Sequence, residues 1–317
     1  MKNKILITGA SGFIGENLYK ILNKKKNVTI TGTSFKNSKK GLIKCNLLHK
    51  KQLNDLVKGN DCIIHCAGYT NTSLDVDKIE KKKIWKYNYE TSKILIKLEK
   101  KNKIKKFIYI SSSKVLGEYS KNMIKENMKP KPKTEYAKSK FYSEKFLNKF
   151  GKLNKIDVIC LRPTLVYGSG CKGNLRNLFK LLKLNLLPEI KKINNKISLI
   201  HVEDLCNALI KVIFTRKRGD LFLLSGPKDL SLNEIVSCMR LAKYKKKSLF
   251  KLNINFLIKL NYFLKKINFF KSTNKICFFI DKLFSSSFYE SRKFNDKYKW
   301  KPKIYPSRGF IEMIRGE

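Results

Sequence analysis

The stretch Thr8-Gly9-Ala10-Ser11-Gly12-Phe13-Ile14-Gly15 decides the fold. It follows the short apolar run Ile5-Leu6-Ile7 and leads into a segment with the apolar spacing of a helix. Gly9 permits a tight turn, Gly12 lets the backbone approach a pyrophosphate, and Gly15 lets the helix pack close to the strand. A helix that begins here offers free N–H groups and positive partial charge to phosphates. The spacing Gly-x-x-Gly-x-x-Gly in this strand-turn-helix context predicts a dinucleotide-binding loop.

Outward from this loop, short apolar runs alternate with longer amphipathic ones. The apolar runs predict buried strands over Lys4–Thr8, Val28–Thr33, Asp61–Cys66, Phe107–Ser111 and Val158–Leu161. The longer runs predict helices over Ile14–Leu22, Lys51–Val57, Ile79–Lys100 and Tyr136–Lys149. Alternating strands and helices predict an α/β fold, a Rossmann-type doubly wound parallel sheet.

The rhythm loosens after Arg162-Pro163. Further helices are predicted over Asn174–Leu184, Asp204–Phe214 and Leu232–Leu241, and further strands over Ile197–Val202 and Leu221–Leu224. We therefore predict a dinucleotide-binding domain over residues 1–166. Residues 167–317 form a smaller C-terminal part that mainly binds substrate, of which about 197–225 returns to the main sheet.

The charge is extreme, with a formal net value of +46. Lysines account for 62 of the 70 basic residues and arginines for only 8. Nucleic-acid and phosphate sites favour arginine because its guanidinium forms paired hydrogen bonds. We therefore attribute the lysines to codon bias and expect no specific nucleic-acid partner, although so much charge attracts polyanions in general. A basic surface also suits an anionic substrate.

Cysteine spacing and hydropathy exclude other classes. The eight cysteines form no Cys-x-x-Cys pair and no zinc-type cluster, so we expect neither a metal site nor an oxidising compartment. No uncharged stretch reaches the length of a membrane span, which predicts a cytoplasmic protein. The segment Phe256–Phe284 is cut repeatedly by lysines. It could form amphipathic helices that pack on their own domain or, alternatively, rest on an anionic membrane surface.

Candidate catalytic groups follow the predicted strand Phe107–Ser111 and begin the helix after it. Tyr136 and Lys140 are four residues apart and share one face of that helix. A nearby ammonium and the positive nicotinamide of an oxidised cofactor would favour the tyrosine phenolate, which can remove a hydroxyl proton. Hydroxyls of the Ser111–Gly117 segment lie where a parallel strand ends, at the edge where such sheets bind ligands.

The second predicted strand leaves the choice of dinucleotide open. An acid at its end would hold the ribose 2′-hydroxyl of NAD, but Gly32-Thr33-Ser34-Phe35-Lys36 contains none. Lys36, Lys39 and Lys40 could instead meet the 2′-phosphate of NADP. We expect NAD or NADP as the cofactor.

At this point the chain resembles the extended short-chain dehydrogenases, the NAD-dependent epimerase/dehydratase family that includes UDP-glucose 4-epimerase. The shared motifs are the glycine loop, Ile64-His65-Cys66-Ala67-Gly68, Asn88, Ser111–Gly117, Tyr136-x-x-x-Lys140, Leu161-Arg162-Pro163-x-x-x-Tyr167-Gly168, Gly173-Asn174-Leu175, Ser198–Leu205 and Tyr298–Pro302. The resemblance covers nearly the whole chain. The sequence around Ser112 and the segment Gly173–Leu187 most resemble a bacterial subgroup of the family that serves surface-polysaccharide synthesis.

The resemblance implies a role for each matching residue. It makes Ser112, Tyr136 and Lys140 catalytic. It places the cofactor against Gly9, Ser11, Gly12, Phe13, Ile14, Gly15, Ser34, Lys36, Asn46, Leu47, Cys66, Ala67, Gly68, Asn88, Tyr136, Lys140 and Pro163. It places the substrate against Ser113, Lys114, Asn174, Lys196 and Lys282. It also implies a homodimer through Ile79–Lys100 and Tyr136–Lys149.

Departures from the family pattern narrow the reaction. The family's 4,6-dehydratases follow the catalytic hydroxyl with Asp-Glu, whereas Ser113-Lys114 stands here, so dehydration lacks its acid and base. Ile197 stands where many epimerases have an arginine that binds the nucleotide phosphates, with Lys196 beside it, and Lys282 takes a second such position. Asn46 replaces an acid that often touches adenine, and Ala137 replaces the usual glycine.

Three functions remain open at this stage. The first is a nucleotide-sugar epimerase, UDP-hexose 4-epimerase-like, that transiently oxidises sugar C4. The second is a reductase that spends NADPH on a UDP-4-keto-6-deoxy sugar. The third is a non-catalytic NAD(P)-binding sensor or assembly subunit, which the retention of Ser112, Tyr136 and Lys140 disfavours.

Overall fold

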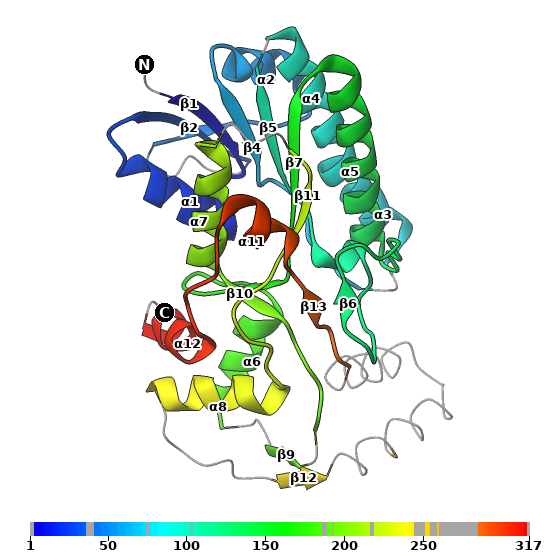
Figure 1. The fold of residues 1–317 in the computed structure, drawn as a ribbon, viewed down its shortest axis with the longest axis vertical. Coiled ribbons are helices and arrows are strands. Elements are labelled where there is room, and N and C mark those ends of the chain that lie inside the picture. Colours follow the sequence, from blue (N-terminus) through cyan, green and yellow to red (C-terminus); the bar gives the residue numbers. More distant parts are fainter. Residues whose placement is uncertain are drawn as a thin grey trace.

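The computed structural model describes residues 3–35, 41–73, 76–102, 104–185, 189–191, 193–215, 219–243, 251–253, 259 and 285–315. Seven parallel strands form the main sheet in the order β11-β7-β5-β4-β1-β2-β3 (Figure 1). These strands are β1 (Asn3–Thr8), β2 (Val28–Ser34), β3 (Leu42–Lys44), β4 (Cys62–His65), β5 (Lys106–Ile110), β7 (Asp157–Pro163) and β11 (Leu221–Leu224). The predicted doubly wound sheet is confirmed. The strand order reverses between β1 and β4, which is where such sheets bind ligands.

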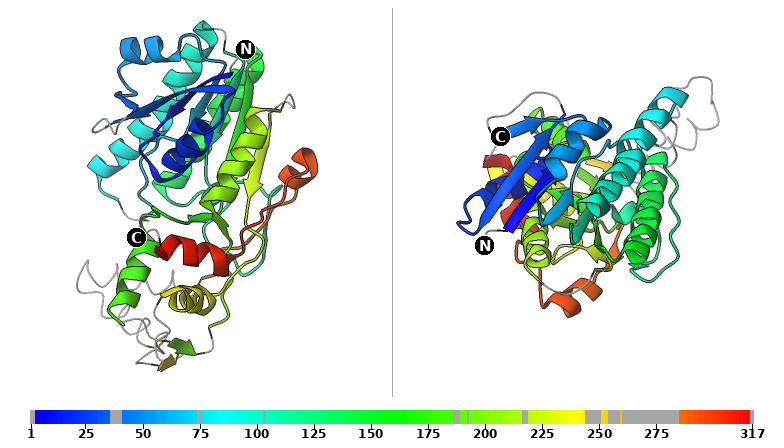
Figure 2. Two further views of the ribbon diagram at one scale, coloured as in Figure 1. Left: turned by 90° about the vertical axis from the view of Figure 1, so that its left-hand side faces the viewer. Right: turned by 90° about the horizontal axis from the view of Figure 1, so that it is seen from above.

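Helices cover both faces of this sheet (Figure 2). One face carries α1 (Phe13–Asn23) and α7 (Val202–Ile213), and the other carries α2 (Lys50–Val57), α4 (Thr91–Lys101) and α5 (Glu135–Asn154). Side chains alternate along β1, so that Ile5 and Ile7 enter the first core while Leu6 enters the second. All three are fully buried, and each contributes about 1.5–3 kcal/mol through removal of apolar surface from water.

A second, smaller lobe lies beyond the carboxyl ends of the main-sheet strands (Figure 1). Its core is built from α6 (Asn174–Lys183), α8 (Leu232–Lys243) and α12 (Pro306–Arg315). The remaining short elements are β6 (Ile124–Lys125), β8 (Leu165–Tyr167), β9 (Glu189–Lys191), β10 (Leu199–His201), β12 (Lys251–Asn253), β13 (Tyr289–Glu290) and α11 (Lys293–Tyr298). They form three two-stranded sheets, β10-β8, β12-β9 and β13-β6, and a helix beside β11.

From the segment 197–225, β11 joins the main sheet and α7 packs on one of its faces, whereas β10 pairs with β8 in a separate two-stranded sheet. One helix differs from the sequence expectations. The helix expected over Ile79–Lys100 is interrupted: α3 (Lys78–Trp85) passes through a π-turn, η1 (Lys86–Glu90), before α4 begins. The division of the chain at residues 166 and 167 stays a prediction.

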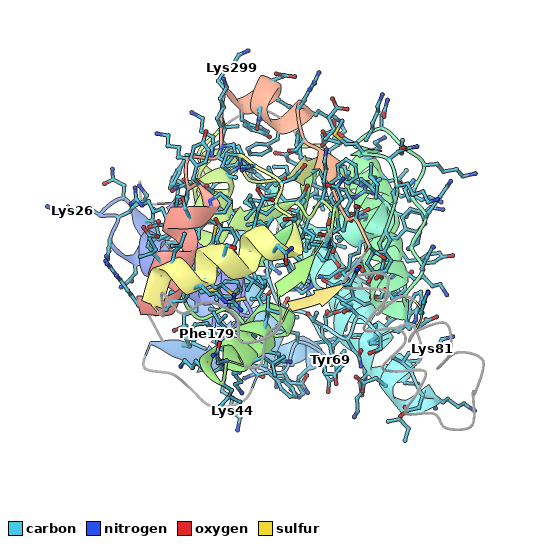
Figure 3. All side chains as sticks on the ribbon, turned by 90° about the horizontal axis from the view of Figure 1, so that it is seen from below. Lys26, Lys44, Tyr69, Lys81, Phe179 and Lys299 are labelled. Carbon is cyan, nitrogen blue, oxygen red and sulfur yellow. The ribbon has the colours of Figure 1, made fainter. Side chains whose placement is uncertain are left out.

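Lysine side chains extend from the surface on several sides (Figure 3). The labelled Lys26, Lys44, Lys81 and Lys299 come from four different parts of the chain. The predicted amphipathic segment 256–284 lies outside the described residues except for residue 259. Within the described residues, none of the helices combines the length and the apolar character that crossing a bilayer requires.

Candidate active site

The glycine loop forms a cradle between the end of β1 and the start of α1. Gly9 has φ +72°, and a Cβ there would lie 2.6 Å from the backbone of Ala67. A Cβ on Gly15 would lie 2.2 Å from the Gly9 carbonyl oxygen, so α1 approaches the loop as closely as backbone allows. Gly12 caps α1 with extended backbone and no side-chain bond, which leaves the first-turn N–H groups without a side-chain cap. These features fit a bound pyrophosphate.

The other residues expected at the cofactor come from several elements. The Ser34 hydroxyl, at the end of β2, donates to the Ser11 hydroxyl at 3.0 Å. Phe13 and Ile14 are half-buried against the main core, Asn46 is exposed, and Leu47 packs on the second core. Pro163 ends β7. The three lysines that would favour NADP, Lys36, Lys39 and Lys40, lie outside the described residues.

The segment after β4 lies at the switch point of the sheet, where sheets of this kind bind ligands. Cys66 is half-buried, and burial raises the pKa of its thiol to about 12 while Lys140 lowers it. Gly68 is exposed, and a Cβ on it would lie 3.3 Å from the Lys140 Nζ atom. A side chain at residue 68 would therefore crowd the Lys140 ammonium group.

Asn88 lies in the π-turn and is completely buried. Its Oδ1 accepts from the Tyr69 N–H at 2.7 Å, and its Nδ2 donates to the Tyr69 carbonyl at 3.0 Å and to the Ser139 hydroxyl at 2.9 Å. Because both amide hydrogens and the amide oxygen are engaged within the chain, this geometry favours a positioning role for Asn88 over the expected direct contact with the cofactor. π-turns of this kind occur frequently at functional sites.

The three expected catalytic residues meet at the carboxyl end of β5. The hydroxyls of Ser112 and of Thr70 both lie close enough to Tyr136 to favour its ionised form. Lys140, one turn further along α5, donates from Nζ to the Ile110 carbonyl oxygen at 2.8 Å and lies over the Tyr109 ring. Ser112 is the second residue after β5 and caps the turn η2 (Ser113–Val115).

The pKa values of Tyr136 and Lys140 differ from the expectation that Lys140 lowers the pKa of the Tyr136 phenol. Burial raises the pKa of Tyr136 to about 12, more than the two neighbouring hydroxyls lower it. Burial also lowers the pKa of Lys140 to about 8. The chain by itself therefore keeps Tyr136 protonated at neutral pH, and lowering its pKa requires a further positive charge.

The expected substrate contacts divide into two groups. Ser113 is buried, and its hydroxyl contacts Tyr289, so it is committed to an internal partner. Lys114 is partly exposed and pairs with Glu118. Lys196 is exposed over the Phe288 ring, with its backbone bonded to residues 286 and 287. The Asn174 side chain and all of Lys282 lie outside the part of the chain that the structure describes.

Sequence reasoning missed Thr70, Glu118 and Tyr289. Thr70 comes from the connection after β4. Tyr289 comes from β13, near the C-terminus, and its hydroxyl donates to the Gly117 carbonyl at 2.9 Å. No local spacing links either residue to Tyr136. Glu118 was detectable as the residue after the Ser111–Gly117 segment, but its burial was not.

One group of possible metal ligands occurs among the described residues: His201, Glu203 and Glu312. His201 Nδ1 accepts from the Glu203 N–H at 3.4 Å, so the proton of neutral His201 resides on Nε2, where a metal would need a lone pair. Arg308 also binds Glu312 at 2.8 Å. Both contacts disfavour a cation here, and the prediction of no metal stays a prediction.

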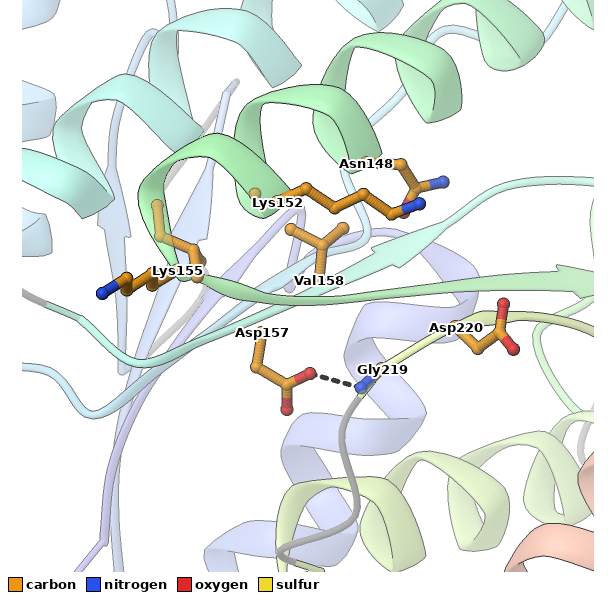
Figure 4. A pocket seen from close by; sticks show the side chains of 9 residues that line it. Asn148, Lys152, Lys155, Asp157, Val158, Gly219 and Asp220 are labelled. Atoms are coloured by element: carbon orange, nitrogen blue, oxygen red, sulfur yellow. Dashed lines mark hydrogen bonds between the residues drawn. The ribbon is translucent and has the colours of Figure 1, made fainter.

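A hollow of about 670 Å³ lies at the amino-terminal end of β7 (Figure 4). Lys152, Lys155, Asp157 and Asp220 line it, and Asp157 accepts from the Gly219 N–H. Its walls come from the amino-terminal ends of β7 and β11, whereas Ser112 and Tyr136 lie beyond the carboxyl end of β5. This hollow is therefore separate from the candidate active site.

Comparison with known proteins agrees with this geometry. The NAD dependent epimerase/dehydratase family matches residues 5–222, which is more than half of the chain. The chain belongs to this family and is an NAD-dependent enzyme of that class. The UDP-glucose 4-epimerase of Vibrio cholerae is 29% identical over 253 residues, 76% of each chain.

Solved structures share the fold over nearly the full length. The UDP-glucuronic acid 4-epimerase of Bacillus cereus, in complex with UDP-glucuronic acid and NAD, has a TM-score of 0.80 and 20% identity over 99% of this chain and 98% of that one. RMD from Pseudomonas aeruginosa, complexed with NADPH, has a TM-score of 0.74 and 18% identity over 99% of both chains. The family that matches the chain is NAD dependent, which agrees with the expected cofactor, NAD or NADP.

Proposed function

We propose that this protein is a nucleotide-sugar 4-epimerase that acts by transient oxidation at sugar C4, on a substrate joined to a nucleotide such as UDP. The observation that carries the proposal is the meeting of the Ser112 and Tyr136 hydroxyls beyond β5, with Lys140 anchored to the strand carbonyl beside them. The glycine cradle and the switch point of the sheet support this proposal, because dinucleotides bind at such points in doubly wound sheets.

In this proposal, Tyr136 is the acid and base. Its phenolate takes the proton of the 4-hydroxyl, and Ser112 holds that hydroxyl by a hydrogen bond. NAD, when bound, would accept the hydride from C4 and return it to the opposite face of the 4-keto sugar after that sugar turns over, and its positive charge would lower the pKa of Tyr136. Tyr136 then returns the proton to the C4 oxygen, which completes the epimer. Lys140 holds ribose hydroxyls of the cofactor and fixes the geometry, so much of the rate enhancement comes from positioning.

The remaining site residues have proposed supporting roles. The N-terminus of α1 and Gly12 bind the pyrophosphate, and Ser11 and Ser34 lie beside them. Asn88 holds the Tyr69 backbone and so fixes the connection that carries Thr70. The cytoplasmic location and the lack of a specific nucleic-acid partner stay predictions.

The test is product analysis with purified protein. Incubation with UDP-glucose, UDP-galactose and their uronic acids in the presence of NAD should interconvert the C4 epimers without net change in reduced cofactor. Stoichiometric loss of NADPH absorbance with a UDP-4-keto-6-deoxy sugar, and no epimer, would show the reductase instead. If neither occurs, the proposed reaction is wrong.

We also propose a homodimer through α3, η1, α4 and α5. Aromatic rings follow one another along this face: Trp85 contacts Tyr89 and Tyr142, and Phe146 contacts Tyr89 and Phe150. Tyr142 is 47% exposed although its ring contacts Trp85. Exposed aromatic side chains that are grouped on one face are typical of a surface that binds a partner. Light scattering after gel filtration should give twice the mass of 37.0 kDa. A Tyr142→Asp variant should shift the protein towards monomer.

A further inference from the structure

Two separate segments carry the hydroxyls that meet beyond β5. Ser112 caps the turn η2, and Tyr136 is the second residue of α5. The connection between these segments runs over residues 117–133 and includes the short strand β6. A backbone bond from the Lys131 N–H to the Val115 carbonyl, at 3.1 Å, brings the two ends of the connection together. The separation of the two hydroxyls depends also on how η2 and the first turn of α5 are oriented.

Glu118 lies in this connection, and its two carboxylate oxygens bind one segment each. Oε2 lies 3.3 Å from the Lys114 Nζ atom of η2, and Oε1 accepts from the Thr134 hydroxyl at 2.7 Å, at the start of α5. The Glu118 side chain is 1% exposed, and Thr134 is fully buried. Such bonds are electrostatically stronger in the interior than in water. One carboxylate therefore links the two segments that carry the reacting hydroxyls.

Each of these two contacts continues to a reacting group. The Lys114 backbone N–H donates to the Ser112 hydroxyl oxygen at 3.3 Å. The Thr134 hydroxyl, whose hydrogen points to the carboxylate, accepts from the Ala137 N–H at 3.2 Å and so caps α5. Ala137 directly follows Tyr136, so this cap fixes the turn on which the phenol lies. A displacement of the shared carboxylate would change the orientation of both reacting groups.

We propose that Glu118 is a positioning residue of the epimerase reaction, which holds the turn with Ser112 and the helix with Tyr136 in the relative orientation that proton transfer requires. This inference rests on the proposed function, because it takes Tyr136 as the group that transfers the proton. Such positioning matters because a displacement of about 1 Å between reacting groups can cost roughly 100-fold in rate.

The charge of Glu118 gives this role an electrostatic signature. Burial raises the pKa of Tyr136 to about 12, and two neighbouring hydroxyls lower it. The Glu118 carboxylate raises it further, because a negative charge disfavours the phenolate. The other charged or titratable groups at this cluster are Lys114 of η2, Lys140 of α5, Tyr109 of β5, Tyr119 of the connection and Tyr289 of β13. A neutral residue 118 should therefore lower the pKa of Tyr136.

The first experiment measures kcat and KM of the full-length protein with NAD and UDP-glucose or UDP-galactose. Glu118→Ala removes both contacts, and it should lower kcat roughly 10- to 100-fold with a change in KM of less than about threefold. Glu118→Gln has nearly the same shape and keeps an oxygen for Thr134, but its amide cannot replace the charge beside Lys114. Its loss of kcat should be smaller, and the ascending limb of its pH profile of kcat/KM should move to lower pH. A purely structural role would not move that limb.

Thr134 separates orientation from charge. Thr134→Val removes the hydroxyl between the carboxylate and α5 but leaves the Glu118 charge, so kcat should fall roughly 10-fold without a shift of the limb to lower pH. Thr134→Ser keeps the hydroxyl and should restore most of kcat. Glu126→Gln is the matched control, because that carboxylate lies in the same connection but accepts from the N–H groups of Leu223 and Lys293. It should change neither kcat nor the pH profile. Thermal unfolding of each variant identifies any loss of fold.

The second experiment needs no turnover. The ultraviolet absorbance of the tyrosine phenolate is recorded against pH for the wild type and Tyr136→Phe at the same NAD concentration, and the difference reports the ionisation of Tyr136. The same difference between Glu118→Gln and Glu118→Gln/Tyr136→Phe should titrate at lower pH. Because both members of each pair share every other tyrosine, the contribution of Tyr119 and Tyr289 cancels.

An unchanged kcat in Glu118→Ala, or a phenolate difference that titrates at the same pH in both backgrounds, would overturn the inference while leaving the epimerase proposal standing. If the wild type epimerises no UDP-sugar, the proposed function fails, and the phenolate titration still decides whether Glu118 acts on Tyr136.

Discussion

The backbone after β1 approaches the backbone after β4 closely at Gly9, and this contact can be tested with a second glycine, Gly59, as the control. Gly9 and Gly59 both have left-handed backbone, with φ +72° and +76°. A Cβ on Gly9 would lie 2.6 Å from both Cα and N of Ala67, whereas a Cβ on Gly59 would meet nothing within 4 Å. Alanine at either position incurs the same backbone cost, and only Gly9→Ala adds a steric cost.

The magnitudes follow from this difference. Gly59→Ala should lower the free energy of unfolding by about 1–2 kcal/mol, the cost of left-handed backbone for a residue with a Cβ. Gly9→Ala should add about 1–3 kcal/mol for forcing packed backbone apart, giving about 2–5 kcal/mol in total. Because Ala67 lies directly against the glycine loop that is proposed to hold the pyrophosphate, Gly9→Ala should also abolish NAD binding at concentrations that saturate the wild type, and Gly59→Ala should not.

The assay is urea unfolding of the wild type and both variants, with NAD binding measured by calorimetry on the folded proteins. Equal destabilisation by the two variants, or retention of NAD affinity in Gly9→Ala, would show that the strand ends are not held as closely as the structure indicates. The reasoning from backbone contact to cofactor cradle would then be refuted.

Four further predictions address catalysis and stability. Tyr136→Phe should lower kcat/KM by at least roughly 100-fold without changing unfolding, because it removes the proton-transfer group. Thr70→Val should move the ascending limb of the pH profile of kcat/KM to higher pH, because the Tyr136 phenolate loses a hydrogen-bond donor and the pKa of Tyr136 rises. Glu99→Gln should stabilise the protein by about 1–3 kcal/mol at pH 7 and hardly at all at pH 4. Arg162→Met should destabilise it by about 3–5 kcal/mol, because the guanidinium is bonded at 2.8 and 2.6 Å to the buried Glu144 carboxylate.

The sign for Glu99 follows from its surroundings. Its carboxyl is fully buried, with no hydrogen-bond partner among the described residues, and burial raises its pKa well above the ordinary value. As the pH rises through the ordinary value of the unfolded chain, the unfolded state loses this proton and the folded state keeps it, so stability falls. Denaturant unfolding at several pH values should show that this slope is smaller in Glu99→Gln. An unchanged slope would contradict the burial.

Matched variants control the catalytic predictions. Tyr142→Phe, on the same helix as Tyr136, should leave kcat/KM unchanged apart from any effect of dimerisation. Thr70→Ser should restore the wild-type pH profile, and Thr72→Val, from the same connection, should not move it. A Thr70→Val profile that coincides with the wild type would exclude Thr70 from contact with the Tyr136 oxygen.

Local sequence patterns determined most of the main sheet. Each glycine of the first loop, each apolar run and each cap concerns residues that are neighbours along the chain, so spacing alone carries the information. The strands were placed within a residue or two of their observed ends, apart from β3, which is only Leu42–Lys44 and too short to show a pattern. Tyr136 and Lys140 were found for the same reason, since one helix carries both.

Only the tertiary structure decided which groups meet between elements. It brings Thr70 to Tyr136, engages the Asn88 amide with Tyr69 and Ser139, and buries His65 between Thr8 and Ser92, which lowers the pKa of that imidazole to about 3. It also reverses the expected effect on Tyr136, since burial raises the pKa of its phenol more than the hydroxyls of Ser112 and Thr70 lower it. Desolvation depends on everything packed around a group, and no spacing along the chain encodes that.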